Sequence, residues 1–171
     1  MKKILFLFFV VFLFVSCDER FMSWKEYNED WIVEQKDKLG VDTNVVEVEI
    51  LPSGVLIEKY HTGYGAIPKP SVDPVMGVSS LVKVKYTGWL VDGTRFDYSD
   101  GASFYLSDVV SGWQEALSLM PQGSHWKIYV PYNKGYGEVG SKGLRGNFSI
   151  PPYSTLIFDI EGCDSSRSEE R

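Results

Sequence analysis

The chain has 171 residues, 44% hydrophobic and 23% charged, a composition typical of a globular protein with room for one domain and some accessory structure. Its formal net charge of −6 argues against nucleic acid and anionic lipid as binding partners. The aromatic content, 15%, is high.

The first residues are typical of an export signal. Two lysines precede twelve apolar residues, Ile4 to Val15, a run too short for a permanent membrane helix. The run ends in a small residue followed by Cys17, which predicts a bacterial lipoprotein: residues 1–16 are removed and Cys17 is lipidated. A plain secretory peptide is the alternative. Loss of the two lysines would change the net charge from −6 to −8, and acylated Cys17 would leave Cys163 without a disulfide partner.

Residues Asp18 to Leu39 predict an amphipathic helix that stops at Gly40. The apolar residues near one stripe are Trp24, Tyr27, Trp31 and Leu39. This stripe must be covered, either by the body of the same domain or by a second copy in a homodimer. Both arrangements are open at this point.

Several strand patterns follow. Val45 to Ile50 and Val55 to Tyr60 flank a Pro-Ser-Gly turn, and a loop rich in glycine and proline covers Thr62 to Ser80. From Leu81, apolar and polar residues alternate with the period of a half-buried strand. The apolar positions are Val82, Val84 and Tyr86, and the polar ones are Lys83 and Lys85.

A turn at Asp92-Gly93 predicts that Thr94 to Tyr98 returns as a strand, and Ser103 to Leu106 forms a further extended piece. A short helix is expected from Ser111, which has capping-box spacing to Gln114. Its apolar face is Trp113, Ala116, Leu117 and Met120, and a Pro-Gln-Gly stop ends it after about two and a half turns.

The last part of the chain predicts two more strands. His125 to Val130 alternates and ends at Pro131, a glycine-rich loop runs to Asn147, and Thr155 to Glu161 forms the final strand. The inward row of that strand is Leu156, Phe158 and Ile160. Many strands with one short helix indicate an α+β domain with a mostly antiparallel sheet.

Three kinds of site are excluded on the sequence. Gly135 to Gly140 reads G-x-G-x-x-G, but the glycines and prolines that follow preclude the helix that a dinucleotide pyrophosphate requires. His61, His125 and Cys163 are isolated and lack ligand-like spacing, so no metal or cofactor is expected. No serine lies in a nucleophile elbow.

Five aromatic residues suggest a different kind of site. They come from two strands, the helix, the glycine-rich loop and the last strand: Tyr86, Phe96, Trp113, Tyr136 and Phe158. Taken singly, each is a core residue. If the helix packs across the concave face of the sheet, their rings converge on one apolar pocket that suits a small molecule or a proline.

The order of five motifs resembles that of the FKBP-type peptidyl-prolyl cis-trans isomerases. They are YTG at Tyr86-Thr87-Gly88, DGTRFD from Asp92 to Asp97, VVSGW from Val109 to Trp113, GYG from Gly135 to Gly137, and IPPYSTLIFDIE from Ile150 to Glu161. The resemblance implies an FKBP-like fold, a mostly antiparallel twisted sheet wrapped around one short helix, over residues 45–163. A helical extension or linker (17–44) would precede it, and a polar tail (164–171) would follow.

The resemblance also implies roles for nine residues. Those expected to take part in catalysis are Tyr86, Phe96, Asp97 and Tyr136; those expected to bind substrate are Val109, Val110, Trp113, Ile150 and Phe158. The chain departs from the family in three places. Ala102 replaces an aromatic found in many members, the loop 138–149 is longer, and the arginine after the Phe-Asp pair is absent, with Arg95 as a substitute.

Three hypotheses about function follow. The first is a prolyl isomerase without a cofactor, anchored in the cell envelope on the periplasmic side or outer membrane of a Gram-negative-type bacterium, acting on proline-containing exported proteins. The second is a binding module of the same fold with weak or no isomerase activity, because of Ala102 and the missing arginine. The third is a structural lipoprotein that assembles through the helix from Trp24 to Leu39.

Overall fold

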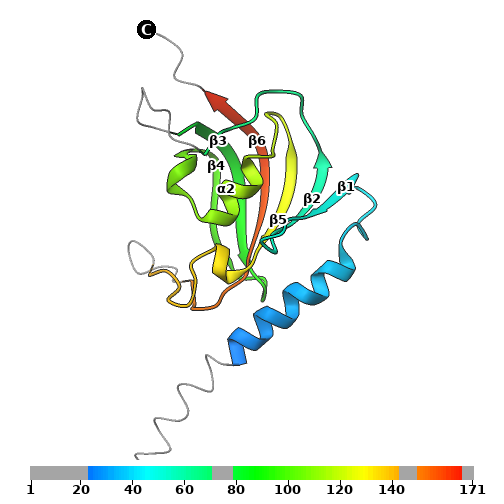
Figure 1. Cartoon of the computed structure of the whole chain (residues 1–171), viewed down its shortest axis with the longest axis vertical. Helices are drawn as coiled ribbons and strands as arrows, with labels where there is room; N and C mark the ends of the chain where they lie inside the picture. The colour runs from blue at the N-terminus through cyan, green and yellow to red at the C-terminus, as the bar shows by residue number, and fades with distance from the viewer. Residues whose placement is uncertain (1–22, 71–78, 143–149, 167–171) are drawn as a thin grey trace, which may run out of the picture.

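The computed structural model describes residues 23–70, 79–142 and 150–166. Within these ranges, six strands form one sheet in the order β1-β2-β5-β6-β3-β4, with antiparallel neighbours throughout (Figure 1). A short helix, α2 (Ser111–Leu117), lies against one face of the sheet. The predicted α+β fold, an antiparallel sheet around one short helix, is therefore confirmed.

The remaining elements are β1 (Glu47–Ile50), β2 (Leu56–His61), β3 (Leu81–Leu90), β4 (Arg95–Tyr105), η1 (Leu106–Asp108), β5 (His125–Val130), η2 (Tyr132–Lys134) and β6 (Leu156–Ser166). Their bounds agree with most of the predicted strands to within one or two residues, although β6 continues five residues past Glu161. The expected loop 62–80 holds neither helix nor strand in its described residues, 62–70 and 79–80.

β3 has the predicted alternation, with Val82, Val84 and Tyr86 buried and its two lysines exposed. Gly93 has a φ of 85° in the predicted turn, a left-handed conformation that favours glycine. The prediction of two separate strands after this turn is wrong. β4 runs unbroken from Arg95 to Tyr105, and Leu106 lies in η1. The register between β3 and β4 shifts between Val84 and Tyr86 and again between Gly88 and Trp89, and the two strands stay paired on either side of each shift.

The core lies between α2 and the sheet. The four predicted apolar residues of the helix, Trp113, Ala116, Leu117 and Met120, are all buried. Gly112 permits the close packing of helix on sheet, because a Cβ there would lie 2.4 Å from Cγ1 of Val130 on β5. Gly112 therefore lets α2 lie close to β5, because any side chain at this position would collide with Val130.

The predicted capping box is wrong. The Oγ of Ser111 donates a 3.2 Å hydrogen bond to the carbonyl of Lys134, and Nε2 of Gln114 donates one of 2.8 Å to the carbonyl of Val109. Both side chains therefore tie the helix to neighbouring loops instead of capping its first turn. α2 also ends earlier than expected, at Leu117, because the next residues form tighter turns: the N–H of Leu119 donates to the Ala116 carbonyl.

The N-terminal helix covers residues 23–38 and packs on its own domain, one of the two arrangements left open by the sequence. Trp31 contacts the ring of Tyr129 with centroids 5.9 Å apart, and Nε1 of Trp24 donates a 3.1 Å hydrogen bond to Oγ of Ser154. Tyr27, predicted for the apolar stripe, is 47% exposed. Asn28 is fully buried instead, and its Oδ1 accepts the backbone N–H of Thr155 at 2.7 Å.

The predicted signal segment, 1–16, Cys17 and the predicted first turn of the helix, 18–22, lie outside the described residues, as do 143–149 of the long loop. Among the residues that the structure does describe, no helix combines the length and the apolar character that crossing a bilayer requires.

Candidate functional site

Four aromatic rings from four elements pack against one another. Trp113 of α2 contacts Phe158 of β6 and Tyr86 of β3 nearly edge to face, with centroid distances of 4.9 and 5.1 Å. Phe96 of β4 in turn contacts Phe158 at 5.5 Å and an interplanar angle of 86°. Edge-to-face packing is the favourable geometry of such pairs. The predicted convergence is therefore observed for four of the five aromatic residues.

Gly88 explains how these rings come so close to the sheet. A Cβ at this position would lie 2.8 Å from Cζ of Phe96 and 3.1 Å from Cε1 of Phe158. The position lies two residues after Tyr86 on the same face of β3, so a side chain here would occupy the space of both phenylalanine rings. The glycine is therefore part of the site as well as part of the strand.

The main polar contact at the site joins Tyr86 to Asp97. The Tyr86 hydroxyl donates a 2.6 Å hydrogen bond to Oδ2 of Asp97, and the backbone N–H of Tyr98 donates to Oδ1 at 2.9 Å. Burial, followed by the hydrogen bond and charge of Asp97, raises the pKa of Tyr86. The phenol therefore stays protonated and serves as a donor to the carboxylate.

Tyr136 lies in the turns that follow η2 and is 41% exposed. Partial burial, and then the negative charge of Asp97, raise its pKa. The Tyr136 side chain is therefore close enough to Asp97 for the carboxylate charge to disfavour ionisation of the phenol. Residues 135–139 form turns.

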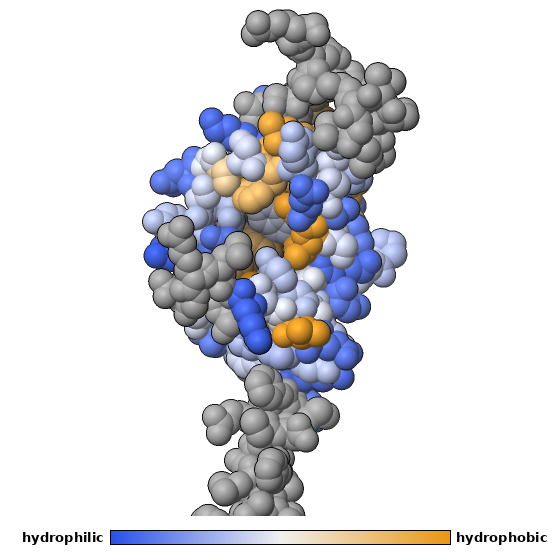
Figure 2. Space-filling model, turned by 90° about the vertical axis from the view of Figure 1, so that its left-hand side faces the viewer, coloured by the Kyte–Doolittle hydropathy of each residue, from blue (hydrophilic) through white to orange (hydrophobic). Residues whose placement is uncertain are grey.

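The remaining predicted residues border the same core. Val109 and Val110, between η1 and α2, are partly buried against it, and Ile150 is 6% exposed and pairs with Ser141 through an isolated bridge. On the face where β4 and α2 lie, Figure 2 shows apolar surface gathered around a hollow. An apolar hollow with few polar groups suits a small apolar ligand or a proline ring.

Phe104 was not predicted as a site residue. Its ring lies 5.9 Å from that of Tyr86 and 6.0 Å from that of Trp113. Phe104 faces the same side of β4 as Ala102, so the alternation of side chains along a strand could have identified it as a site residue.

The indole N–H of Trp113 is buried and has no hydrogen-bond partner among the described residues. Such an unpaired donor is costly, and such groups tend to occur at functional sites.

The comparisons with known proteins agree with this geometry. Residues 76–161, half of the chain, match the family model described as FKBP-type peptidyl-prolyl cis-trans isomerase. The chain belongs to the FKBP-type isomerase family. All four rings of the cluster, Asp97 and Tyr136 fall within the matched residues.

Individual FKBP relatives match more of the chain. It is 36% identical over 147 residues to the FKBP-type 22 kDa peptidyl-prolyl cis-trans isomerase of Escherichia coli, an alignment that covers 84% of this chain and 62% of the relative. It is 41% identical over 117 residues to the outer membrane protein MIP of Legionella longbeachae, covering 66% of this chain and 45% of that protein. The chain thus spans roughly half of the length of these relatives.

Solved FKBP structures resemble the whole domain. The crystal structure of FkpA from Escherichia coli covers 94% of this chain with a TM-score of 0.72 and 29% identity, and the match spans 69% of that chain. The isomerase from Pseudomonas syringae covers 82% with a TM-score of 0.60 and 30% identity, and spans 96% of that chain.

The structure corrects one expected feature of this FKBP site. Arg95 does not replace the arginine that many members use to hold the aspartate. Its guanidinium lies 4.8 Å from the centre of the Tyr98 ring, and the described partners of Asp97 are the Tyr86 hydroxyl and the Tyr98 amide. Ala102 lies opposite Val84 in register and is partly buried against the core.

Proposed function

We propose that this protein is a peptidyl-prolyl cis-trans isomerase that acts on proline-containing segments of exported polypeptides. The observation that carries the proposal is the edge-to-face packing of Tyr86, Trp113 and Phe158 beside an apolar hollow. Rotation of an X-Pro amide must overcome a barrier of about 18–20 kcal/mol, because resonance is lost. The planar amide is the more charge-separated form, so an apolar site favours the twisted transition state over it.

In this proposal the proline ring lies on Trp113, with Tyr86, Phe96 and Phe158 as the walls of the pocket. Ile150, together with the two valines before α2, would grip the residues that flank the proline. No covalent intermediate is required, because the pocket acts by binding the twisted amide more tightly than the planar one.

The polar groups would hold one half of the peptide while the other half rotates. The backbone N–H of Val110 and the hydroxyl of Tyr136 are the proposed donors to the flanking carbonyls. Asp97 could contact the rotating carbonyl or orient Tyr86. Its 2.6 Å hydrogen bond to the Tyr86 hydroxyl supports the orienting role.

The test is the refolding of a protein whose folding is limited by proline isomerisation. The purified protein should accelerate the slow phase, and Phe158→Leu should reduce the acceleration because it removes a wall of the pocket. Tyr105→Leu is a matched control on an exposed part of β4, where the side chain is 42% exposed. Equal rates with and without the wild-type protein would reject an isomerase. Binding of a proline peptide without acceleration would support the alternative of a binding module.

The proposal includes export and a lipid anchor on Cys17. It is supported by the apolar run from Ile4 to Val15 that ends just before the cysteine, and a relative bears the name outer membrane protein. Mass spectrometry of the protein from bacterial membranes should find an acylated Cys17 as the first residue. Soluble protein with an unmodified cysteine would indicate a plain secretory peptide.

A homodimer through the N-terminal helix is the last part of the proposal. The inward face of this helix already packs on its own domain, so a dimer would use the outward residues Tyr27 and Val33, which are 47% and 59% exposed. Light scattering should then give twice the chain mass for the wild type and a single chain mass for Val33→Asp. A monomeric wild type would exclude this assembly.

A further inference from the structure

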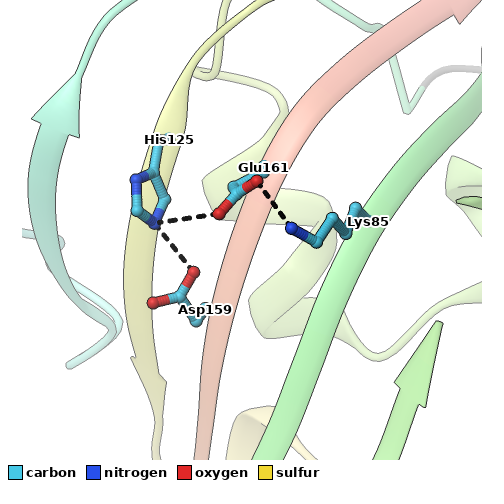
Figure 3. Close-up of polar contacts among 4 residues, drawn as sticks. All are labelled: Lys85, His125, Asp159 and Glu161. Carbon is cyan, nitrogen blue, oxygen red and sulfur yellow. Dashed lines mark hydrogen bonds and ion pairs between the residues drawn. The ribbon is translucent and has the colours of Figure 1, made fainter. Parts of the chain in front are cut away.

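A polar cluster lies on the face of the sheet opposite α2 (Figure 3). Along β6, Phe158 and Ile160 are buried on the side of the helix, so Asp159 and Glu161 project from the other side. His125 on β5 is the register partner of Glu161. Two adjacent strands therefore place three potential metal ligands side by side, although the histidine and Asp159 are 34 residues apart in sequence.

The distances within this cluster suit a single metal ion. Nε2 of His125 lies 2.8 Å from Oδ1 of Asp159 and 4.0 Å from Oε1 of Glu161, and the three ligand atoms lie within 4.8 Å of one another. Ligands around a tetrahedral zinc ion are separated by about 3.4 Å, as follows from bond lengths near 2.1 Å. The 2.8 Å contact between His125 and Asp159 is a hydrogen bond in this structure, so these two side chains would have to rotate slightly apart, and Glu161 slightly inward, to bind one ion.

Neighbouring groups orient these ligands. The Tyr60 ring stacks on that of His125 with centroids 5.0 Å apart, and Nζ of Lys85 binds Oε2 of Glu161 at 3.1 Å, leaving Oε1 turned toward the imidazole (Figure 3). The three ligand side chains are between 34% and 45% exposed. His125 and Glu161 border an open groove of about 580 Å³, which leaves room for water as a further ligand.

We propose that His125, Asp159 and Glu161 bind a divalent transition-metal ion of the zinc class. One imidazole with two carboxylates suits zinc, whereas magnesium and calcium prefer ligand sets made only of oxygen. His125 lacks ligand-like spacing in the sequence, but the pairing of β5 with β6 brings two carboxylates next to it. The site is separate from the proposed isomerase pocket, since it lies on the other face of the sheet, where the ion would cross-link β5 and β6.

The test is calorimetric titration with zinc chloride, together with thermal unfolding, of the full chain without an affinity tag. Cys17→Ser and Cys163→Ser in this background remove the thiols as competing ligands. We expect one zinc ion per chain and a zinc-dependent rise in Tm, because an ion bound only to the folded state stabilises it. Magnesium chloride at the same concentration should have no effect.

Variants assign the ligands. His125→Gln and Asp159→Asn should each weaken zinc binding by more than about tenfold. His61→Gln is the matched control, since His61 is the only other histidine and lies outside the proposed ligand set. Lys85→Met should tighten binding, because it removes a competing positive charge from Glu161, and a gain cannot result from misfolding.

The proposal is overturned if the wild type shows no zinc-dependent shift in Tm, or if His125→Gln retains the full shift. Isomerase activity measured without zinc should be the same in His125→Gln as in the wild type, which separates this site from the pocket. Loss of zinc binding on His61→Gln instead would also reject the ligand set.

Discussion

The hydroxyl of Tyr86 lies 2.6 Å from Oδ2 of Asp97 and joins β3 to β4 beside the aromatic cluster. Because the pKa of Tyr86 is raised, first by burial and then by this carboxylate, the phenol remains a donor above its ordinary titration range near 10. The other carboxylate oxygen accepts the amide of Tyr98. Asp97 is therefore fixed from two sides, by groups other than the arginine that many family members use.

Removing the Tyr86 hydroxyl should lower isomerase activity. Tyr86→Phe keeps the ring but leaves Asp97 free to rotate, and a hydrogen bond to a charged group contributes about 1.5–3 kcal/mol. We expect kcat/KM to fall about tenfold. In a double-mutant cycle with Asp97→Leu the two losses should not add, because both variants break the same bond. Additive losses would mean that the two residues act independently.

Filling the position of Ala102 should strengthen substrate binding. Ala102→Phe adds an apolar ring on the same side of β4 as Phe104, where many family members carry an aromatic. Burying that extra apolar area against substrate is worth about 1–2 kcal/mol, so KM for a proline peptide should fall about tenfold. Ser103→Phe, on the opposite face of β4, is the control and should leave KM unchanged. An unchanged KM for both variants would mean that this wall does not contact substrate.

Asn28 should be essential for docking the N-terminal helix. It is fully buried, its Oδ1 accepts the amide of Thr155 and its Nδ2 donates to the carbonyl of Trp24 at 2.8 Å. Asn28→Ala leaves a buried donor unpaired, which should lower the free energy of unfolding in urea by about 1–3 kcal/mol. Asp30→Ala on the exposed side of the same helix should change it by less than about 0.5 kcal/mol. Equal effects would show that the helix contributes little to stability.

An ion pair beside the site should make stability depend on pH. Nζ of Lys134 lies 2.8 Å from Oε1 of Glu115 and links η2 to α2. Partial burial opposes ionisation of Glu115, but hydrogen bonds from Lys134 and Ser53 and the lysine charge outweigh it and lower the pKa. A lowered carboxyl pKa stabilises the fold above the ordinary value of 4.5, and this contribution is lost as pH falls through the lowered value.

Lys134→Met should therefore reduce the free energy of unfolding at neutral pH by at most about 1 kcal/mol, since both groups are partly exposed. The difference from wild type should shrink as pH falls through the lowered pKa of Glu115 and disappear at an acidic pH where Glu115 is protonated in both proteins. Urea unfolding at the two pH values measures this. A difference that persists in acid would come from packing of the lysine side chain and not from its charge.

Periodicity in the sequence predicts the strands and the helix face because it reflects burial directly. Val82, Val84 and Tyr86 alternate with lysines, and all three are buried. The aromatic cluster follows from the order of the family motifs, which identify Phe96 and Phe158 before any distance is known. These features depend on local patterns, which a single chain displays without an alignment.

Sequence patterns do not reveal features that depend on contacts between residues far apart in the chain. Ser111 and Gln114 have the spacing of a capping box, but Val110 is the N-cap of α2, so Ser111 lies inside the helix and its Oγ donates to the carbonyl of Lys134. Asn28 interrupts an apolar stripe, and only the position of Thr155 explains why it is buried. His125 and Asp159 are neighbours only because β5 and β6 pair in one particular register.

The alternation along β6 makes one strand serve two surfaces, with Phe158 at the aromatic cluster and Asp159 and Glu161 on the reverse side. Inserting or deleting one residue before this stretch would exchange the two sets, placing carboxylates among the rings and a phenylalanine in water. Insertions or deletions ahead of this stretch should therefore be tolerated only when they comprise two residues or when the preceding loop absorbs them. The strand's position along its neighbours constrains the pocket as strongly as the identities of the aromatic residues do.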